Sequence, residues 1–217
     1  MLNICVTEAD SIDMRFNVKK SFFMRCGARY KMKCAELHLA KETIAKVDVI
    51  KYLGVMFKSG MQLKCTFDHV KTAFYRAFNA LYAKCGASQY ELTSVFLMES
   101  YCIPILTYAI EATVLSNGVM KMLDSAVDNA LRKIFKTQSA ESIINIRRNL
   151  QLSGLESIFH RSLCKFLLKF MVSPLTFANI LVNLQLKHLH HILVKYGLRF
   201  NGSLTCALYG ILNVVRL

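Results

Sequence analysis

The chain has 217 residues, a formal net charge of +14 and 54 % hydrophobic residues. Its length suits one domain of ordinary size or two small ones, and its hydrophobic content excludes a globally disordered chain. The positive charge favours acidic partners, with phosphate backbones first and anionic membrane surfaces second, over an ordinary soluble basic protein.

The charged residues are unevenly distributed. Residues 15–33 contain seven basic residues and no acidic one, and seven more basic residues follow Glu156, which is the last acidic residue. The eight cysteines stand singly, without a CxxC pair, and the amino terminus shows no secretory signal pattern. We therefore expect reduced thiols and an intracellular location, in the cytoplasm or the nucleus.

Residues 1–60 have mainly strand-like patterns. Residues 2–5 resemble the end of an amphipathic helix, and residues 16–25 are predicted to form a buried strand. The alternating segments 36–39 and 43–47 predict a hairpin. A further strand is predicted at residues 51–57, before Ser59 and Gly60.

After Gly60 the hydrophobic period changes to about 3.6 residues, which predicts helices. The expected helices span residues 63–85, a segment that follows Ser88 and runs toward residue 114 with a kink at Pro104, and residues 119–136, 141–150 and 155–170. Gly86 is expected to end the first of these, Ser88 and Glu91 to form a capping box, and Asn117 to cap the third. The predicted fold class is α+β, mainly α, with short strands followed by a helical bundle.

The pattern divides the chain into residues 1–60, residues 61–170 and an apolar helical tail, residues 171–217, of unknown role. Residues 170–186 carry no charge, but they include Pro174, Asn179, Asn183 and Gln185, which are unfavourable in lipid. A packed helix is therefore favoured over a membrane segment, and a membrane partner is not expected.

No catalytic motif is found. The chain lacks GxGxxG, P-loop and GxSxG patterns and has no adjacent carboxylates. Asp124 and Asp128 stand four residues apart, which we interpret as a solvated acidic helix face pairing with Lys121 or Arg132.

No metal site is predicted either. His160 and Cys164 are four residues apart, and His188, His190 and His191 cluster, but a zinc site needs about four ligands from spaced pairs. Packing or surface roles are the favoured interpretation of these residues.

Two basic patterns remain as candidates for phosphate contact. The first is residues 15–33, where aromatic residues are interleaved with the basic ones: Phe16, Phe22, Phe23 and Tyr30. Such a pattern can hold phosphate and stack bases, although a strand with core aromatics and solvated charges gives the same pattern. The second is a helical stripe of Arg161, Lys165 and Lys169, shortly after Arg147 and Arg148, and a solvated face is its alternative.

Several segments, taken in order, resemble one family. They are residues 2–5 (LNIC), residues 14–21 (MRFNVKKS), residues 51–55 (KYLGV), residues 74–80 (FYRAFNA) and residues 100–112 (SYCIPILTYAIEA). As a set they resemble the region after the active-site motif in reverse transcriptases of LINE-type (non-LTR) retrotransposons. The resemblance covers about residues 1–150, and the segment beyond Met171 has no counterpart in it.

The resemblance implies a palm remnant followed by a thumb. The intact family enzyme uses Mg²⁺ held by aspartates on earlier motifs, including an F/Y-A-D-D turn, and this sequence has no counterpart of them. The family pattern suggests a pyrophosphate-side role for Lys20, with Lys19 adjacent, and a primer-grip-like hairpin at Tyr52, Leu53 and Gly54. Nine basic residues are then candidate nucleic-acid contacts: Lys19, Arg25, Lys71, Arg76, Arg147, Arg148, Arg161, Lys165 and Lys169.

The expected function is therefore that of a fragment resembling an RNA-directed DNA polymerase, which binds primer–template duplex but is inactive alone and carries no cofactor. A further expected partner is the missing palm and fingers half, if it is encoded elsewhere. The alternatives are a stand-alone basic helical domain that binds nucleic acid or protein, and a membrane-associated protein that uses residues 170–215. Residues 1–60 are expected to be poorly held alone, because a partial palm sheet exposes edges and apolar faces.

Overall fold

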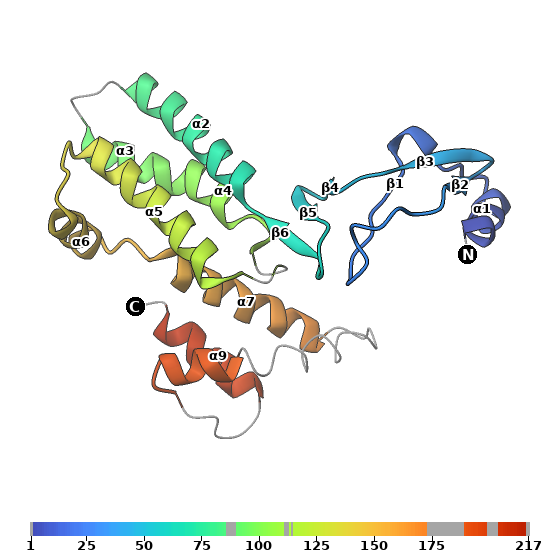
Figure 1. Ribbon diagram of the computed structural model, residues 1–217. Helices are drawn as coiled ribbons and strands as arrows, with labels where there is room; N and C mark the ends of the chain where they lie inside the picture. The colour runs from blue at the N-terminus through green and yellow to red at the C-terminus, as the bar shows by residue number, and fades with distance from the viewer. Residues whose placement is uncertain are drawn as a thin grey trace. The chain divides into compact units, whose positions relative to one another are not determined.

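The computed structural model describes residues 2–85, 90–110, 113, 115–172, 189–198 and 204–215. The chain divides into two compact units, Met1–Phe67 and Asp68–Leu217, which we call the strand unit and the helical unit. The described strands all lie in the first, and the second consists of helices (Figure 1). This confirms the predicted α+β, mainly α fold class.

The first sheet of the strand unit contains the predicted hairpin. Its strands are β1 (Phe22–Phe23), β2 (Leu37–Leu39) and β3 (Glu42–Lys46), in the order β1-β3-β2. β2 and β3 are antiparallel, with Leu39 opposite Glu42, so the predicted hairpin is confirmed. Ala40 and Lys41 form its two-residue turn with φ of 49° and 69°, a left-handed pair whose twist matches that of the strands.

The second sheet differs from the prediction. It consists of β4 (Val49–Tyr52), β5 (Val55–Lys58) and β6 (Lys64–Thr66), all antiparallel. Residues 51–57 are therefore not one strand, because the chain reverses between Tyr52 and Val55, which are directly paired. Residues 64–66 pair with β5 instead of starting the predicted helix. The ladder gives their backbone groups partners that a free helix end lacks.

The buried strand predicted at residues 16–25 is also wrong in extent. Only β1 is a strand, and the preceding Val18–Lys20 form a single 3₁₀ turn, η1. The Asn17 side chain accepts a hydrogen bond from the Lys20 backbone N–H at 3.2 Å, and a local bond of this kind competes with strand pairing. The chain before η1 begins with a helix, α1 (Leu2–Ser11).

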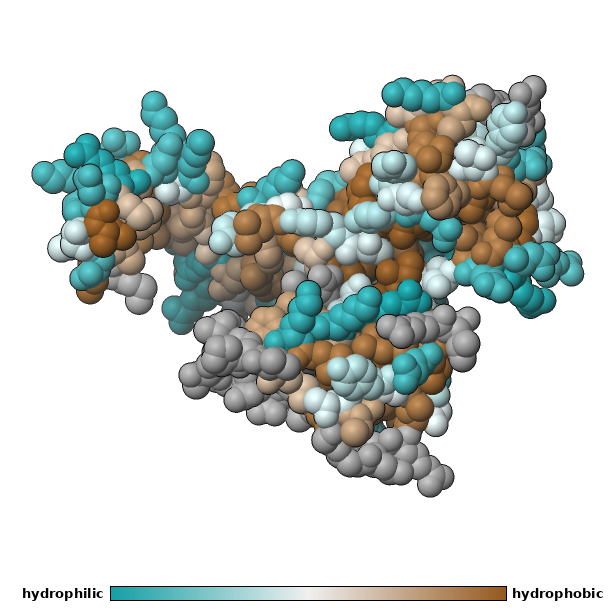
Figure 2. All heavy atoms as spheres, turned by 180° about the vertical axis from the view of Figure 1, so that it is seen from behind, coloured by the Kyte–Doolittle hydropathy of each residue, from teal (hydrophilic) through white to brown (hydrophobic). Residues whose placement is uncertain are grey.

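The strand unit has very little core. Among the described residues up to 67, the buried hydrophobic side chains are Leu39, Ile44 and Phe67. Twelve large hydrophobic residues of the same unit are exposed: Ile4, Ile12, Met14, Phe16, Phe22, Met32, Leu37, Val49, Tyr52, Leu53, Met61 and Leu63. On the face seen in Figure 2, hydrophobic residues of this unit show among hydrophilic ones. So much exposed apolar surface is typical of a surface that another molecule covers.

The helical unit is built from helices of very different length. They are α2 (Asp68–Cys85), α3 (Glu91–Leu97), η2 (Met98–Cys102), α4 (Ile103–Thr107), α5 (Asn117–Ile134), α6 (Ala140–Asn149), α7 (Leu155–Val172) and α9 (Leu204–Val214), with a further helical stretch at 189–195. α2, α4 and α5 pack together, and α7 lies between this group and α9 (Figure 1). The helices predicted at residues 141–150 and 155–170 are confirmed as α6 and α7.

The helix predicted to follow Ser88 and to run toward residue 114 is interrupted as expected at Pro104, but not by a simple kink. A π-helical turn, η2, precedes α4, whose first turn contains Pro104, and α4 ends at Thr107. Proline has no N–H for the preceding turn and its ring crowds the backbone there, which a wider π turn relieves. The predicted Ser88 cap and the Gly86 helix end lie outside the described residues. Ser116, and not Asn117, caps α5 by accepting a hydrogen bond from Val119 N at 3.3 Å.

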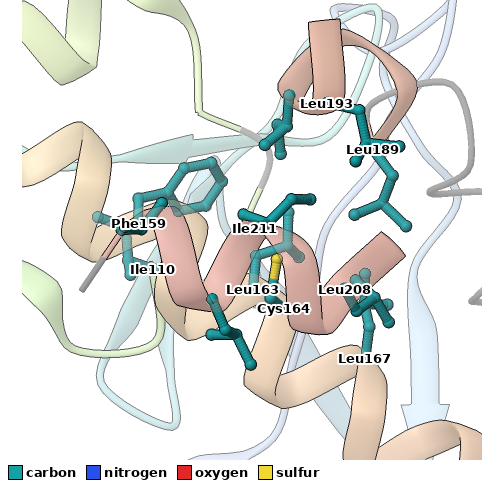
Figure 3. Packing of buried hydrophobic residues seen from close by; sticks show 12 residues of the cluster. Ile110, Phe159, Leu163, Cys164, Leu167, Leu189, Leu193, Leu208 and Ile211 are labelled. Atoms are coloured by element: carbon teal, nitrogen blue, oxygen red, sulfur yellow. The ribbon is translucent and has the colours of Figure 1, made fainter. Parts of the chain in front are cut away.

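Two packed groups of side chains stabilise the helical unit. The first includes Phe74 and Phe78 of α2, which stack with their ring centroids 6.2 Å apart, and α5 residues such as Leu131. The second joins α7, the stretch 189–195 and α9, and Figure 3 shows its side chains pointing toward one another. Cys164 lies inside it, and burial raises the pKa of its thiol to about 12.

Most of the uncharged segment 170–186 lies outside the described residues, so its predicted packing stays a prediction. The helical stretch at 189–195 contributes Leu189, Ile192 and Leu193 to the second group. In the part of the chain that the structure describes, no helix has the length and apolar content needed to span a bilayer.

An ion pair links α7 to the stretch 189–195. Lys195 Nζ lies 2.5 Å from Glu156 Oε1, and this hydrogen bond holds the pKa of Glu156 below its ordinary value near 4.5. A lowered carboxyl pKa contributes stability above the unfolded-state pKa, and that contribution is lost as the pH falls through the folded-state pKa. The stabilisation is therefore present at pH 7 and is lost at acidic pH, as the pH falls through the lowered pKa of Glu156.

We expect Glu156→Gln to lower the free energy of unfolding by less than about 1 kcal/mol at pH 7, because both partners are half exposed to solvent. As the pH is lowered from 7 to 3, the difference in urea midpoint between the variant and the parent chain should shrink. Glu141→Gln, an exposed acid with no ion pair among the described residues, is the control. A difference that persists unchanged at pH 3 would contradict the proposed role of the pair.

Candidate nucleic-acid interface

The acid-free segment 15–33 is an exposed cationic surface in the strand unit. Six of its seven basic residues are exposed: Arg15, Lys19, Lys20, Arg29, Lys31 and Lys33. Arg25 is half-buried, and its Nη1 donates to the Cys34 Sγ at 3.4 Å. Within the described residues, no carboxylate forms an ion pair with any of the seven, so their charge is available to an outside anion.

Aromatic side chains accompany these cations. Phe16 and Phe22 are 45 % and 44 % exposed, so they are not the core residues that the alternative interpretation requires. Phe23 and Tyr30 are half-buried, and the Lys31 ammonium lies 5.7 Å from the centre of the Tyr30 ring. Exposed aromatic rings between unpaired cations are the elements with which proteins bind bases and phosphates together.

Lys19 and Lys20 both lie on η1 with exposed side chains. Asn17 holds this turn, since it also accepts a hydrogen bond from the Ser21 hydroxyl at its carbonyl oxygen, at 2.9 Å. The turn presents two adjacent ammonium groups to solvent. The pyrophosphate-side role of Lys20 stays a prediction.

The predicted primer-grip segment forms the tip of the β4–β5 hairpin. Tyr52 and Leu53 are 63 % and 73 % exposed, and Leu53 and Gly54 have φ of 47° and 82°. The left-handed conformation is natural for glycine but unfavourable for leucine, by roughly 1–2 kcal/mol. A strained, exposed leucine beside an exposed tyrosine forms an apolar tip on which a ligand can rest, although its role as a primer grip stays a prediction.

Leu53→Gly should stabilise the hairpin by up to about 1 kcal/mol, because glycine adopts a positive φ without strain. The measurement is hydrogen exchange of the β4 and β5 amides, which should slow severalfold. Leu63→Gly is the matched control, because Leu63 is also an exposed leucine of this unit but has no positive φ. Replacing Leu63 by glycine should leave the stability of the strand unit unchanged or lower it. Faster exchange in Leu53→Gly would show that the leucine side chain holds the hairpin.

Five predicted cations of the helical unit stay accessible and two do not. Arg76, Arg148, Lys165 and Lys169 are exposed, and Lys71 on α2 is half-buried. Arg147 and Arg161 instead make contacts within the protein.

Arg147 joins α6 to α5. Its guanidinium lies 3.2 Å from Asp124 Oδ1 and 2.7 Å from Asp128 Oδ1, and only 16 % of the arginine side chain is exposed. Asp124 also accepts a hydrogen bond from the Leu155 backbone N–H at 3.2 Å. The partners predicted for the two aspartates, Lys121 or Arg132, were therefore wrong.

Arg161 closes the carboxyl end of α9. Its Nη2 donates to the Val215 carbonyl at 2.5 Å, where the helix dipole favours a cation, and its Nε is buried. The predicted stripe of three basic residues on α7 is thus reduced to Lys165 and Lys169.

The residues considered as metal ligands are His160 and Cys164 in the helical core, His190 and His191, which are exposed on the stretch 189–195, and His188. His160 is buried and its Nδ1 lies 2.9 Å from the Tyr196 hydroxyl, while Cys164 is surrounded by apolar side chains. His188 is outside the described residues. Where the structure is described, no three His, Cys, Asp or Glu side chains gather closely enough to hold a metal ion.

A polar seam between α2 and α5 was not predicted. Asn129 donates to the Tyr75 hydroxyl at 3.2 Å, Lys133 donates to Asn79 at 2.9 Å, and the Lys133 ammonium lies 5.1 Å from the centre of the Tyr82 ring. The sequence signal for this seam is the four-residue spacing of its polar residues, Tyr75 with Asn79 on α2 and Asn129 with Lys133 on α5. This seam accounts for Tyr75 and Asn79 of the FYRAFNA segment as packing residues, and leaves Arg76 exposed.

No protein-family model matches this chain, no curated protein matches it, and no solved structure matches it.

Proposed function

We propose that this chain is a nucleic-acid-binding part of a LINE-type reverse transcriptase, corresponding to the end of the palm and the thumb, and that it has no polymerase activity by itself. The observation that carries the proposal is the exposed, unneutralised cationic segment 15–33 with Phe16 and Phe22 standing out from it. Cations of this kind bind phosphates and release counterions, while aromatic faces accept bases.

The helical unit adds phosphate contacts that do not depend on base sequence. The accessible cations are Lys71, Arg76, Arg148, Lys165 and Lys169. Arg147 and Arg161 are no longer part of the proposed interface, because their guanidinium groups are engaged within the protein. Contacts to phosphate alone position a duplex without reading its bases, as a thumb does in the proposed assignment.

The proposal assigns no metal-dependent catalysis to this chain. Polymerisation in the intact family enzyme needs carboxylates that hold two Mg²⁺ ions. Asp124 and Asp128 share the Arg147 guanidinium, so part of their negative charge is compensated within the protein and their oxygens are engaged with a cation already. A missing palm and fingers half, supplied by another chain, would complete the polymerase and cover the exposed apolar residues of the strand unit.

The test compares two double variants with the same loss of charge in the strand unit. Lys19→Gln/Lys20→Gln removes two exposed cations of segment 15–33, whereas Lys58→Gln/Lys64→Gln removes two exposed cations from the paired strands β5 and β6. Affinity for an RNA–DNA hybrid is measured by fluorescence anisotropy between 50 and 200 mM salt. We expect only the first variant to bind about tenfold more weakly and to reduce the slope of log K against log salt by about 2.

Equal effects of the two variants would show a nonspecific response to net charge and would overturn the assignment of segment 15–33. Salt-independent binding, or none, would overturn the nucleic-acid function itself. Primer extension on an RNA template with Mg²⁺ is run on the same preparation. Extension by the chain alone would contradict the proposed lack of polymerase activity.

A further inference from the structure

A small pocket lies in the first sheet of the strand unit. Its volume is about 220 Å³, and it is lined by side chains of β1, β3 and the segment before β2: Phe23, Lys33, Cys34, Glu36, Ile44 and Lys46. Pockets that enclose a drug-sized ligand measure roughly 300–1,000 Å³, so this one suits a fragment the size of a single base.

The pocket combines an aromatic wall with unpaired cations. Ile44 is buried beneath it, and Phe23 is half-buried. Phe23 is paired with Lys46 in the parallel β1–β3 ladder, so the aromatic residue and this cation stand at the same level of the sheet. Lys33 and Lys46 are exposed and have no ion-pair partner among the described residues.

Two further groups shape the chemistry of the pocket. The Arg25 guanidinium, which donates to Cys34 Sγ at 3.4 Å, adds a third positive charge next to the lining. Glu36 is exposed and supplies a carboxylate, which accepts hydrogen bonds from exocyclic amino groups of bases. Cytosine and adenine carry such a group and uracil does not.

We propose that this pocket receives one unpaired nucleotide of a single strand, with the base against Phe23, the phosphate between Lys33 and Lys46, and Glu36 favouring an amino-bearing base. The inference rests on the proposed nucleic-acid function and adds to it a site for an unpaired end beside a bound duplex. Stacking on an aromatic ring tolerates any base, so the carboxylate is the element that discriminates between bases.

Cys34 can report on occupancy, because this residue lines the pocket and carries a free thiol. The full chain is treated with iodoacetamide, and the alkylation rate of each cysteine is followed by mass spectrometry with AMP, UMP or inorganic phosphate present. We expect AMP to slow alkylation of Cys34 several-fold, UMP to protect less at the same concentration, and inorganic phosphate to protect little. Cys26, an exposed thiol of the same unit outside the pocket, is the internal control and should react at an unchanged rate.

Three variants test the assigned roles. Phe23→Leu keeps an apolar side chain but removes the aromatic face, so about tenfold more AMP should be needed to protect Cys34. Lys33→Gln should weaken protection similarly, whereas Lys31→Gln, an exposed cation two residues away that does not line the pocket, should not. Circular dichroism of each variant shows whether it has kept the fold of the parent chain.

Equal protection by inorganic phosphate and AMP would show that the pocket is only an anion site, and would overturn the inference. The inference would also be overturned if Cys34 were not protected, or if alkylation of Cys26 slowed as much as that of Cys34. Anisotropy with the RNA–DNA hybrid separates this result from the proposed function. Duplex binding without protection of Cys34 would refute the nucleotide site in the pocket but not the proposed function. Protection of Cys34 without duplex binding would refute the primer–template function but not the nucleotide site.

Discussion

Replacing Arg147 by methionine will lower the free energy of unfolding of the helical unit by about 2–3 kcal/mol. The substitution leaves Asp124 and Asp128 facing each other without the guanidinium that now lies 3.2 and 2.7 Å from them. Removing one partner of a buried pair costs about 3–5 kcal/mol, and the partial exposure of the two carboxylates lowers that figure here. Urea unfolding followed by circular dichroism at 222 nm measures the change.

The matched control is Arg148→Met, the exposed neighbour on α6, which should change the free energy of unfolding by less than about 0.5 kcal/mol. Adding Asp124→Asn and Asp128→Asn to Arg147→Met should recover a large part of the loss, because no uncompensated charge is left. If Arg147→Met is as stable as the parent chain and also weakens duplex binding, Arg147 is a phosphate contact after all.

Hydrogen exchange will show protection factors at least a hundredfold higher in the helical unit than in the strand unit. Amides of β3 and β5 should exchange with opening free energies below about 2 kcal/mol, whereas amides of α5 should require unfolding of the helical unit, at about 5 kcal/mol or more. The reason is the difference in core: Leu39 and Ile44 are among the few buried side chains of the strand unit, whereas α5 alone buries six residues.

One hydrogen-exchange experiment on the full chain, followed by mass spectrometry of peptic peptides, measures the exchange rates of both units. Comparable protection in β3 and α5 would show that the strand unit is held far better than its buried residues explain. Addition of RNA–DNA hybrid should raise protection in the strand unit, because a ligand that binds only the folded form stabilises it by mass action.

The parts of the fold that were predicted correctly are those specified by neighbouring residues. The β2–β3 hairpin follows from alternation on either side of residues 40–42, and α6 and α7 follow from helical spacing. The strand predicted from the pattern at residues 51–57 missed the β4–β5 reversal because Leu53 adopts a left-handed conformation that leucine seldom takes, so the Leu-Gly pair did not indicate a turn. Only the family resemblance implied a hairpin at these residues. β6 was missed because its three residues were read as part of the following helix.

The candidate site was predictable only as a set of charges. The sequence shows that residues 15–33 are basic, but not that Phe16 and Phe22 are exposed, which depends on how little of the segment joins the sheet. Arg147 is separated from Asp124 by 23 positions and Arg161 from Val215 by 54, so both contacts come from tertiary packing that local spacing does not report. Exposed cations such as Lys165 had the same sequence signal as these two.

The small core of the strand unit also sets the apparent strength of any ligand that binds there. A ligand that requires the folded form meets only the folded fraction of molecules, and its apparent Kd is the intrinsic Kd divided by that fraction. Warming or mild denaturant would then weaken binding before the helices unfold. A second protein that covers exposed apolar residues outside segment 15–33, such as Ile4, Val49 and Leu63, would tighten nucleic-acid binding without touching the nucleic acid, which is positive cooperativity through conformational selection.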